Sequence, residues 1–250
     1  MPIMTIGTGR TLISGGRPYY KKILSYGPIA YWPLWETAGT VAQCLTNPAM
    51  NGTYARNVPA MGTGIGIGDG PTAPTFDGVN DVVDVHSAAL AAAFNGAEGT
   101  LMTWCRWPGA AFWTDGVGYN AMRLSSDINN VAQINKTTTN NLLSAEYTAG
   151  GVYLQRGAAG QAQTIWFLFW GTWSKSADQL RGYVNTAEYA PIINGLGVWA
   201  NPLAAGRCVI GAVNLGPAAP WVGRLCHAAV WDRPLSLAEG AALYYAANPT

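Results

Sequence analysis

Residues 222–248, VGRLCHAAVWDRPLSLAEGAALYYAAN, decide the fold of this chain. Their first part predicts a strand over 222–232, because branched and aromatic residues follow a glycine-bounded turn. Side chains of a strand alternate between its two faces. One face of this strand should therefore carry Leu225, His227, Ala229 and Trp231.

A short helix is predicted directly after this strand. Ser236 stands three residues before Glu239, which is the spacing of a capping box, where two side chains satisfy free backbone N–H groups at a helix start. The helix should run from Leu237 to about Ala246. A last strand that leads into a closing helix predicts a β-sandwich in which this strand lies beside the first one, over 29–36.

Composition supports an all-β protein. Of 250 residues, 49% are apolar and 11% charged, and the chain holds 31 Gly, 15 Pro and 11 Trp, so turns and bulky core residues are frequent. One sandwich of this length is common. We expect an antiparallel two-sheet jelly roll over 26–250, preceded by an extended N-terminal arm over 1–25 and closed by the short helix.

Strand patterns recur along the whole domain. The segments at 75–77 and 81–85, joined by Gly78-Val79-Asn80, predict a hairpin. The run TIWFLFWGT at 164–172 is apolar on both faces, so we expect a central strand whose outer side is covered by a loop or a partner. Further strands are predicted at 100–107, 120–124, 132–135, 142–147, 152–156, 179–185 and 207–212.

The charge is small overall and unevenly placed. Net charge is +1, which argues against nucleic-acid binding, since such binding needs clustered Lys and Arg. Four basic residues nevertheless precede Glu36, the first acidic one. We expect the arm to bind a partner surface, with packing on its own domain as the alternative. The residues proposed for this contact are Arg10, Arg17, Tyr19, Tyr20, Lys21 and Lys22.

The four cysteines show no spacing typical of a metal site, and we expect buried free thiols. They are Cys44, Cys105, Cys208 and Cys226. The first residues contain no apolar segment of signal-peptide length, and no run reaches about 20 apolar residues, the length of a membrane span. We therefore expect a protein made in a host cytoplasm without a signal peptide, and no membrane partner.

In order along the chain, several segments resemble the laminin-G-like, concanavalin A-like jelly-roll domains. They are YGPIAYWPLWE (26–36), PTFDGVNDVVDV (74–85), GTLMTWCRW (99–107), IWFLFWGTWSKSADQLRGYVN (165–185), CVIGAV (208–213) and GRLCHAAVWDRPLSLAEGAALY (223–244). The resemblance implies two antiparallel sheets with adjacent first and last strands. Cys44 stands where many such domains carry an Asp, and the E-x-D-x-E strand of the related hydrolases is missing, which argues against carrying over their sites.

Candidate catalytic groups are few, and we expect no enzyme. His86 and His227 lie in strand-like segments without a recognisable nucleophile motif, and His227 is expected in the core. Asp77, Asp81 and Asp84 form the densest acidic group. Their spacing favours turn chemistry and leaves a calcium site as a weak alternative. No cofactor is expected.

Aromatic residues provide the remaining candidates. Four tryptophans are candidates for stacking against sugar rings, with core filling or subunit contact as the more frequent use of this residue. They are Trp113, Trp173, Trp199 and Trp221.

Two functions fit these observations. The first is a structural virion protein, a capsid-decoration or tail-associated jelly roll of a phage particle, bound through its arm to other virion proteins or to copies of itself. The low surface charge, the arm and the use of jelly rolls in capsids favour it. The alternative is a carbohydrate-binding module that recognises glycans on a host surface.

Overall fold

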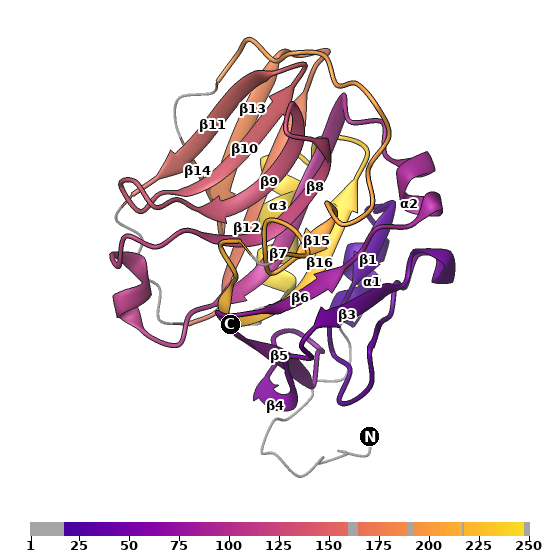
Figure 1. Ribbon diagram of the computed structural model, residues 1–250, viewed down its shortest axis with the longest axis vertical. Coiled ribbons are helices and arrows are strands. Elements are labelled where there is room, and N and C mark those ends of the chain that lie inside the picture. The colour runs from indigo at the N-terminus through magenta and orange to yellow at the C-terminus, as the bar shows by residue number, and fades with distance from the viewer. Residues whose placement is uncertain (1–17, 160–164, 190–192, 217, 248–250) are drawn as a thin grey trace.

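The computed structural model describes residues 18–159, 165–189, 193–216 and 218–247, which form a sandwich of two antiparallel sheets (Figure 1). In the first sheet the strand order is β14 (Ala187–Glu188), β13 (Gln179–Val184), β12 (Phe167–Ser174), β7 (Glu98–Arg106), β16 (Val222–Trp231), β5 (Thr72–Asp77) and β4 (Ala60–Ile65), with β1 (Ala30–Trp32) also paired to β16. The predicted all-β, two-sheet architecture is confirmed.

The second sheet has the order β11 (Val152–Ala158), β10 (Leu143–Ala149), β9 (Asn130–Lys136), β8 (Tyr119–Asp127), β15 (Val209–Ile210), β6 (Asp81–Asp84), β3 (Gly52–Arg56) and β2 (Val41–Ala42). The helical elements are α1 (Tyr19–Leu24), α2 (Ala88–Ala93) and α3 (Leu237–Ala247), with 3-10 turns η1 (Pro48–Met50) and η2 (Ala110–Trp113). Among the described residues no helix has the length and apolar character to cross a membrane.

Two hydrophobic cores lie on opposite faces of the first sheet. The inner core fills the space between the sheets and includes Trp32, Cys105 and Phe169. The outer core lies under α1 and α3 and includes Trp104 and Trp170. The apolar outer side of β12 is therefore covered by the chain's own C-terminal helix. All four cysteines are buried free thiols, as predicted.

Close contact seats α3 on the first sheet. A Cβ atom at Gly240 would stand 2.2 Å from the ring of Trp170, so only glycine allows the helix to come this near. Leu243 and Ala247 of the same helix are buried in the outer core. The helix thus closes one face of the sandwich, whereas the second sheet has no helix on its outer face among the described residues (Figure 1).

A β-bulge in β16 overturns the prediction of a single continuous face. Leu225 lies in the inner core and Cys226 in the outer one, as alternation requires. The pairing with β7 then shifts between Cys226 and Ala229, and His227 has a φ of 52°. This extra residue changes the phase, so Ala229 and Trp231 face the outer core, opposite to Leu225.

The predicted hairpin at 75–85 is wrong. β5 pairs with β4 and β16 in the first sheet, whereas β6 pairs with β3 and β15 in the second. The connecting turn instead links the two sheets. The Asp77 carboxylate accepts from the N–H groups of Val79 and Asn80, and Asp81 accepts from the N–H of Asp77. The expected turn chemistry is therefore present at Asp77.

The first and last strands are adjacent, as predicted. Ala30 pairs with Val230. The predicted capping box is also present, because the N–H of Ser236 donates to Glu239 over 2.8 Å and the N–H of Glu239 donates to Ser236 Oγ over 3.2 Å. The first strand thus lies beside the last strand, and the capping box starts α3 a few residues after it.

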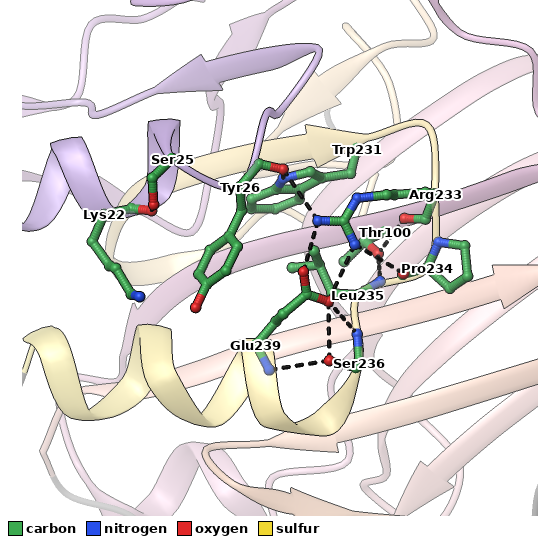
Figure 2. A network of polar contacts seen from close by, with 10 residues as sticks. All are labelled: Lys22, Ser25, Tyr26, Thr100, Trp231, Arg233, Pro234, Leu235, Ser236 and Glu239. Atoms are coloured by element: carbon green, nitrogen blue, oxygen red, sulfur yellow. Dashed lines mark hydrogen bonds and ion pairs between the residues drawn. The ribbon is translucent and has the colours of Figure 1, made fainter.

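Polar contacts around Arg233 form what we call the C-terminal clasp, made by Tyr26, Thr100, Arg233, Ser236 and Glu239 (Figure 2). The Arg233 guanidinium donates to the Glu239 carboxylate over 2.8 and 3.1 Å and to the carbonyl of Tyr26 over 3.2 Å. The Thr100 hydroxyl donates to the carbonyl of Arg233 and accepts from the N–H of Leu235. β7 is thereby tied to the turn that begins α3.

Replacing Thr100 by valine tests the clasp. Thr100→Val keeps the shape but leaves the buried N–H of Leu235 without its acceptor, and such a loss costs about 1–3 kcal/mol. We expect the free energy of unfolding, measured by chemical denaturation, to fall by this amount. Thr53→Val, at an exposed position of β3, is the control and should change it by less than about 0.5 kcal/mol. Equal effects of the two substitutions would contradict the role of Thr100.

His227 is fully buried at the bulge and bonded on both ring nitrogens. Nε2 lies 3.0 Å from the carbonyl of Ile67, which only accepts, so Nε2 carries the proton. Nδ1 then accepts from the hydroxyl of Tyr31, 2.6 Å away. Burial lowers the pKa of His227 to about 4. The neutral ring is therefore the form that the fold accommodates.

This lowered pKa predicts an acid-sensitive fold. Above pH 6.5 the ring is neutral in both states, but as pH falls toward 4 only the unfolded chain takes up the proton, so stability is lost across this window. The loss should reach about 3 kcal/mol. Unfolding measured at pH 7.5 and pH 4 should show this excess loss in the wild type relative to His227→Gln. An identical pH dependence of the two proteins would contradict the prediction.

Candidate functional site

The described part of the predicted arm is built into the domain. Tyr19 is buried in the outer core, where its hydroxyl accepts from Trp104 Nε1 over 2.6 Å. The N–H of Tyr20 donates to Asp69. The ammonium groups of Lys21 and Lys22 lie over the rings of Tyr20 and Tyr26. Other predicted arm residues, Arg10 and Arg17, lie outside the described residues, so binding of a partner by the arm stays a prediction.

Three of the four candidate tryptophans belong to the inner core. The exposed fractions are 4% for Trp113, 3% for Trp173 and 0% for Trp221. Trp221 stacks on Trp107 with ring centres 3.9 Å apart. Rings buried in this way have no face open to a sugar, so the structure corrects their assignment as stacking platforms.

The fourth candidate, Trp199, is half-buried at another end of the sandwich. Its ring contacts Phe94 and Tyr147, which also contact Trp173, whereas Trp113 and Trp221 meet at Trp107. The four tryptophans therefore belong to two separate aromatic clusters and do not form one binding surface.

The acidic group at 77–84 is used within the fold. Asp77 and Asp81 hold the turn between the sheets, and the Asp84 carboxylate accepts from the N–H of His86 over 3.0 Å. No group of three or more His, Cys, Asp or Glu residues suited to a metal ion occurs in the part of the chain that the structure describes. These aspartates therefore provide no set of donors for calcium, which is the weak alternative for this acidic group.

A polar network covers the outer face of the second sheet, across β8 to β11. Its centre is the nearly buried carboxylate of Glu146, which accepts four hydrogen bonds from uncharged donors. The donors are Gln133 Nε2 at 2.5 Å, Gln155 Nε2 at 2.8 Å, and Asn135 Nδ2 and Ser144 Oγ, both at 3.0 Å. We call these five residues, with Asn120 and Tyr153, the polar face.

The network continues onto β8. Gln133 Oε1 accepts from Asn120 Nδ2 over 2.9 Å and from Arg123 Nη1 over 2.8 Å. Asn120 is 1% exposed, and its Oδ1 atom has no hydrogen-bond partner. A buried amide oxygen without a donor costs free energy, and such groups mark positions where a ligand or water completes the site.

A cavity of about 460 Å³ opens over this face. Its wall includes Asn120, Asn135, Glu146, Tyr153 and Gln155, together with threonines of the loop between β9 and β10. Tyr153 is 55% exposed. Partial burial, the charge of the Glu146 carboxylate and a hydrogen bond to it raise the pKa of the Tyr153 hydroxyl, which therefore stays protonated.

An ion pair between buried Lys136, which lines the cavity, and the more exposed Asp115 lies at one side of it. Lys136 Nζ donates to Asp115 Oδ1 over 2.8 Å and to the carbonyl of Val117 over 2.7 Å. Burial alone would raise the pKa of Asp115, but hydrogen bonds from Lys136 and Tyr119 hold it below its ordinary value. The positive charge of Lys136 is therefore compensated by the carboxylate of Asp115.

A second hollow of about 630 Å³ adjoins the first and shares Gly118, Tyr119, Thr138 and Ala219 with it. Phe112 and Pro220 line its far side. The two hollows together offer a polar section over the sheet and a more apolar section beside it, an arrangement suited to an elongated amphipathic molecule.

Sequence analysis missed the polar face, although the sequence carries a signal for it. Three consecutive predicted strands place amide, hydroxyl or carboxyl groups at alternate positions, as in Gln133 and Asn135 or Ser144 and Glu146. Alternation with apolar residues indicates one solvated face, and amides and carboxylates in neighbouring strands indicate a built polar surface. The predicted ligand-binding residues are all tryptophans, so this polar pattern is not part of the prediction.

No family model matches the sequence, and no curated protein matches it. Solved structures do match the fold. Trypanosoma rangeli sialidase, in complex with a difluorinated sugar acid, has a TM-score of 0.57 at 13% identity, over 88% of this chain and 32% of the enzyme. This chain therefore spans about a third of that protein's length.

Two further matches are binding domains. The CBM40 of Ruminococcus gnavus IT-sialidase has a TM-score of 0.53 at 11% identity, over 69% of this chain and 97% of that one, and was also solved bound to α2,3-sialyllactose. The binding domain of botulinum neurotoxin DC, in complex with SialylT, has a TM-score of 0.54 at 12% identity, over 70% and 42%. This chain shares their β-sandwich fold. The expected sandwich of two antiparallel sheets is confirmed, and the neighbours are consistent with a concanavalin A-like fold.

Proposed function

We propose that this protein is a carbohydrate-binding module, and that a glycan lies on the polar face over β8 to β11. The observation that carries the proposal is the network around Glu146, which places amide, hydroxyl and carboxylate groups along the wall of a 460 Å³ cavity. The sugar-bound neighbours of similar fold support it.

The chemistry of the polar face matches that of a saccharide. Sugar hydroxyls both donate and accept hydrogen bonds, and side-chain amides such as those of Asn135 and Gln155 offer both functions at once. The three bonds from amides to Glu146 fix the amide orientations before a ligand arrives. Such preorganisation lowers the entropy cost of binding.

Tyr153 supplies the aromatic surface that the buried tryptophans do not. It is 55% exposed at the edge of the cavity. A flat ring beside hydroxyl-binding groups is suited to the apolar face of a pyranose, because an amphipathic aromatic ring pairs an apolar surface with a polar tip.

Binding without cleavage fits the carboxyl groups of this cavity. Glu146 is the single carboxylate among the described residues that line it. Glycoside hydrolysis by paired carboxylates needs two such groups on either side of the scissile bond. This composition favours a recognition module over a hydrolase.

The virion role remains a prediction. The carbohydrate-binding alternative is favoured by the sialidase CBM40 and the toxin binding domain described above. A glycan-binding module and a particle component are compatible, and attachment through residues 1–17 would join them.

Tyr153→Ala tests the proposed site. After a glycan array, with and without calcium, identifies a ligand, calorimetry should show about tenfold weaker binding, a loss of 1.4 kcal/mol, because the stacking surface is removed. The matched control is Tyr245→Ala, since Tyr245 on α3 is 59% exposed and lies away from the cavity. Its affinity should equal that of the wild type.

Two outcomes would contradict the proposal. One is an array without any bound glycan under either condition. The other is equal loss of affinity in the Tyr153 and Tyr245 variants while both retain the wild-type melting temperature.

A further inference from the structure

We infer that the cavity selects uncharged saccharides and disfavours sugars that carry a carboxylate. This inference rests on the proposed glycan-binding function and names the ligand class of the same site. This ligand class differs from the ligands of the proteins with a similar fold, which include sialic acid and sialyllactose.

The charges at the cavity wall carry the inference. Of the described residues that line it, only Lys136 and Glu146 are charged. Lys136 is 1% exposed and paired with Asp115 over 2.8 Å, so its charge is already compensated. Glu146 accepts from four uncharged donors. Glu146 takes part in none of the ion pairs between described residues, and its nearest counter-charge in the network is Arg123, which binds Gln133 rather than the carboxylate itself. The wall therefore presents a negative charge without a directly bonded cation.

A sugar carboxylate entering this cavity meets two obstacles. It is repelled by Glu146, and because Glu146 is nearly buried, solvent screens this repulsion less than it screens a pair of exposed charges. It also finds no guanidinium fork on the wall, which is the group that binds carboxylates through two parallel hydrogen bonds. A hydroxyl meets neither obstacle, because it can donate to a carboxylate and accept from an amide.

The basic groups closest in the network lie outside the cavity wall. Arg123 on β8 faces the same side as Gln133 and donates one Nη1 bond to it. Burial, followed by the charge of Arg207, lowers the pKa of Arg123, while the charge of Glu146 acts in the opposite direction. Neither arginine is among the residues that line the cavity. Recruitment of Arg123 by an acidic ligand is therefore the alternative that the experiment must detect.

Matched pairs of saccharides test the inference. The pairs are lactose and 3′-sialyllactose, cellobiose and cellobiouronic acid, and galactobiose and digalacturonate, titrated by calorimetry against the full chain. We expect binding of at least one neutral member, with its acidic counterpart at least about tenfold weaker at 10 mM salt. The gap should narrow at 1 M salt, where the Debye length falls from about 30 Å to about 3 Å.

Glu146→Gln supplies a second test. The substitution removes the charge, and because both members of a pair use the same polar face, their affinity ratio is insensitive to any general damage to the network. We expect the preference for the neutral member to fall several-fold. If this variant does not fold, the salt series on the wild type decides alone.

The outcomes separate the two proposals. Equal or tighter binding of the acidic member, lost in Arg123→Gln, would overturn the inferred selectivity and leave the glycan-binding function intact. A neutral preference unchanged by salt and by Glu146→Gln would also overturn the electrostatic account. Absence of binding across all pairs and on the glycan array would overturn both.

Discussion

The extra residue that His227 adds to β16 governs how the sandwich is closed. Without it, the strand would place Leu225 and Trp231 on the same side, and one of the two cores would lose a large side chain. The bulge changes the phase of the strand, so that Leu225 faces the inner core and Trp231 the outer core. The N–H of His227 donates to the carbonyl of Pro33, and its ring binds Tyr31 and Ile67, so β1 and the loop before β5 are held at the same point.

The layer order that follows decides which face is free for a ligand. α1 and α3 occupy the outer face of the first sheet through close apolar contacts, among them that of Gly240 with Trp170. The outer face of β8 to β11 carries the polar face in place of a covering helix. Its residues are bonded mainly to one another, so the surface is rigid as well as polar, which is what recognition of a hydroxyl-rich molecule requires.

Local patterns in the sequence predict the elements well and their long-range relations less well. The capping box at Ser236 and the pairing of the first and last strands follow from short motifs and chain order. The bulge does not, because period-two alternation contains no sign of an inserted residue. The turn at Asp77 is visible locally, but membership of β5 and β6 in different sheets depends on distant partners.

For the candidate site, too, local features could be predicted from the sequence, whereas relations between distant residues could not. Tryptophan content indicates many large side chains but not their burial, and Trp221 is covered by contacts with Trp107 and Tyr119 inside the sandwich. Polar alternation in β9 and β10 does indicate a solvated face. The cavity itself, however, requires the loop between β9 and β10 to meet Val213 and Ala219 over that face, which local patterns do not show.

Side-chain amide resonances provide the most direct measurement of the central claim, that the free face of the second sheet is the binding surface. The NH₂ signals of Gln133, Asn135 and Gln155 can be followed by NMR while a bound neutral saccharide is titrated. The account predicts that these three signals shift in proportion to saturation, while that of Gln179 on the first sheet stays in place. Shifts confined to Gln179 and the surroundings of α3 would contradict it.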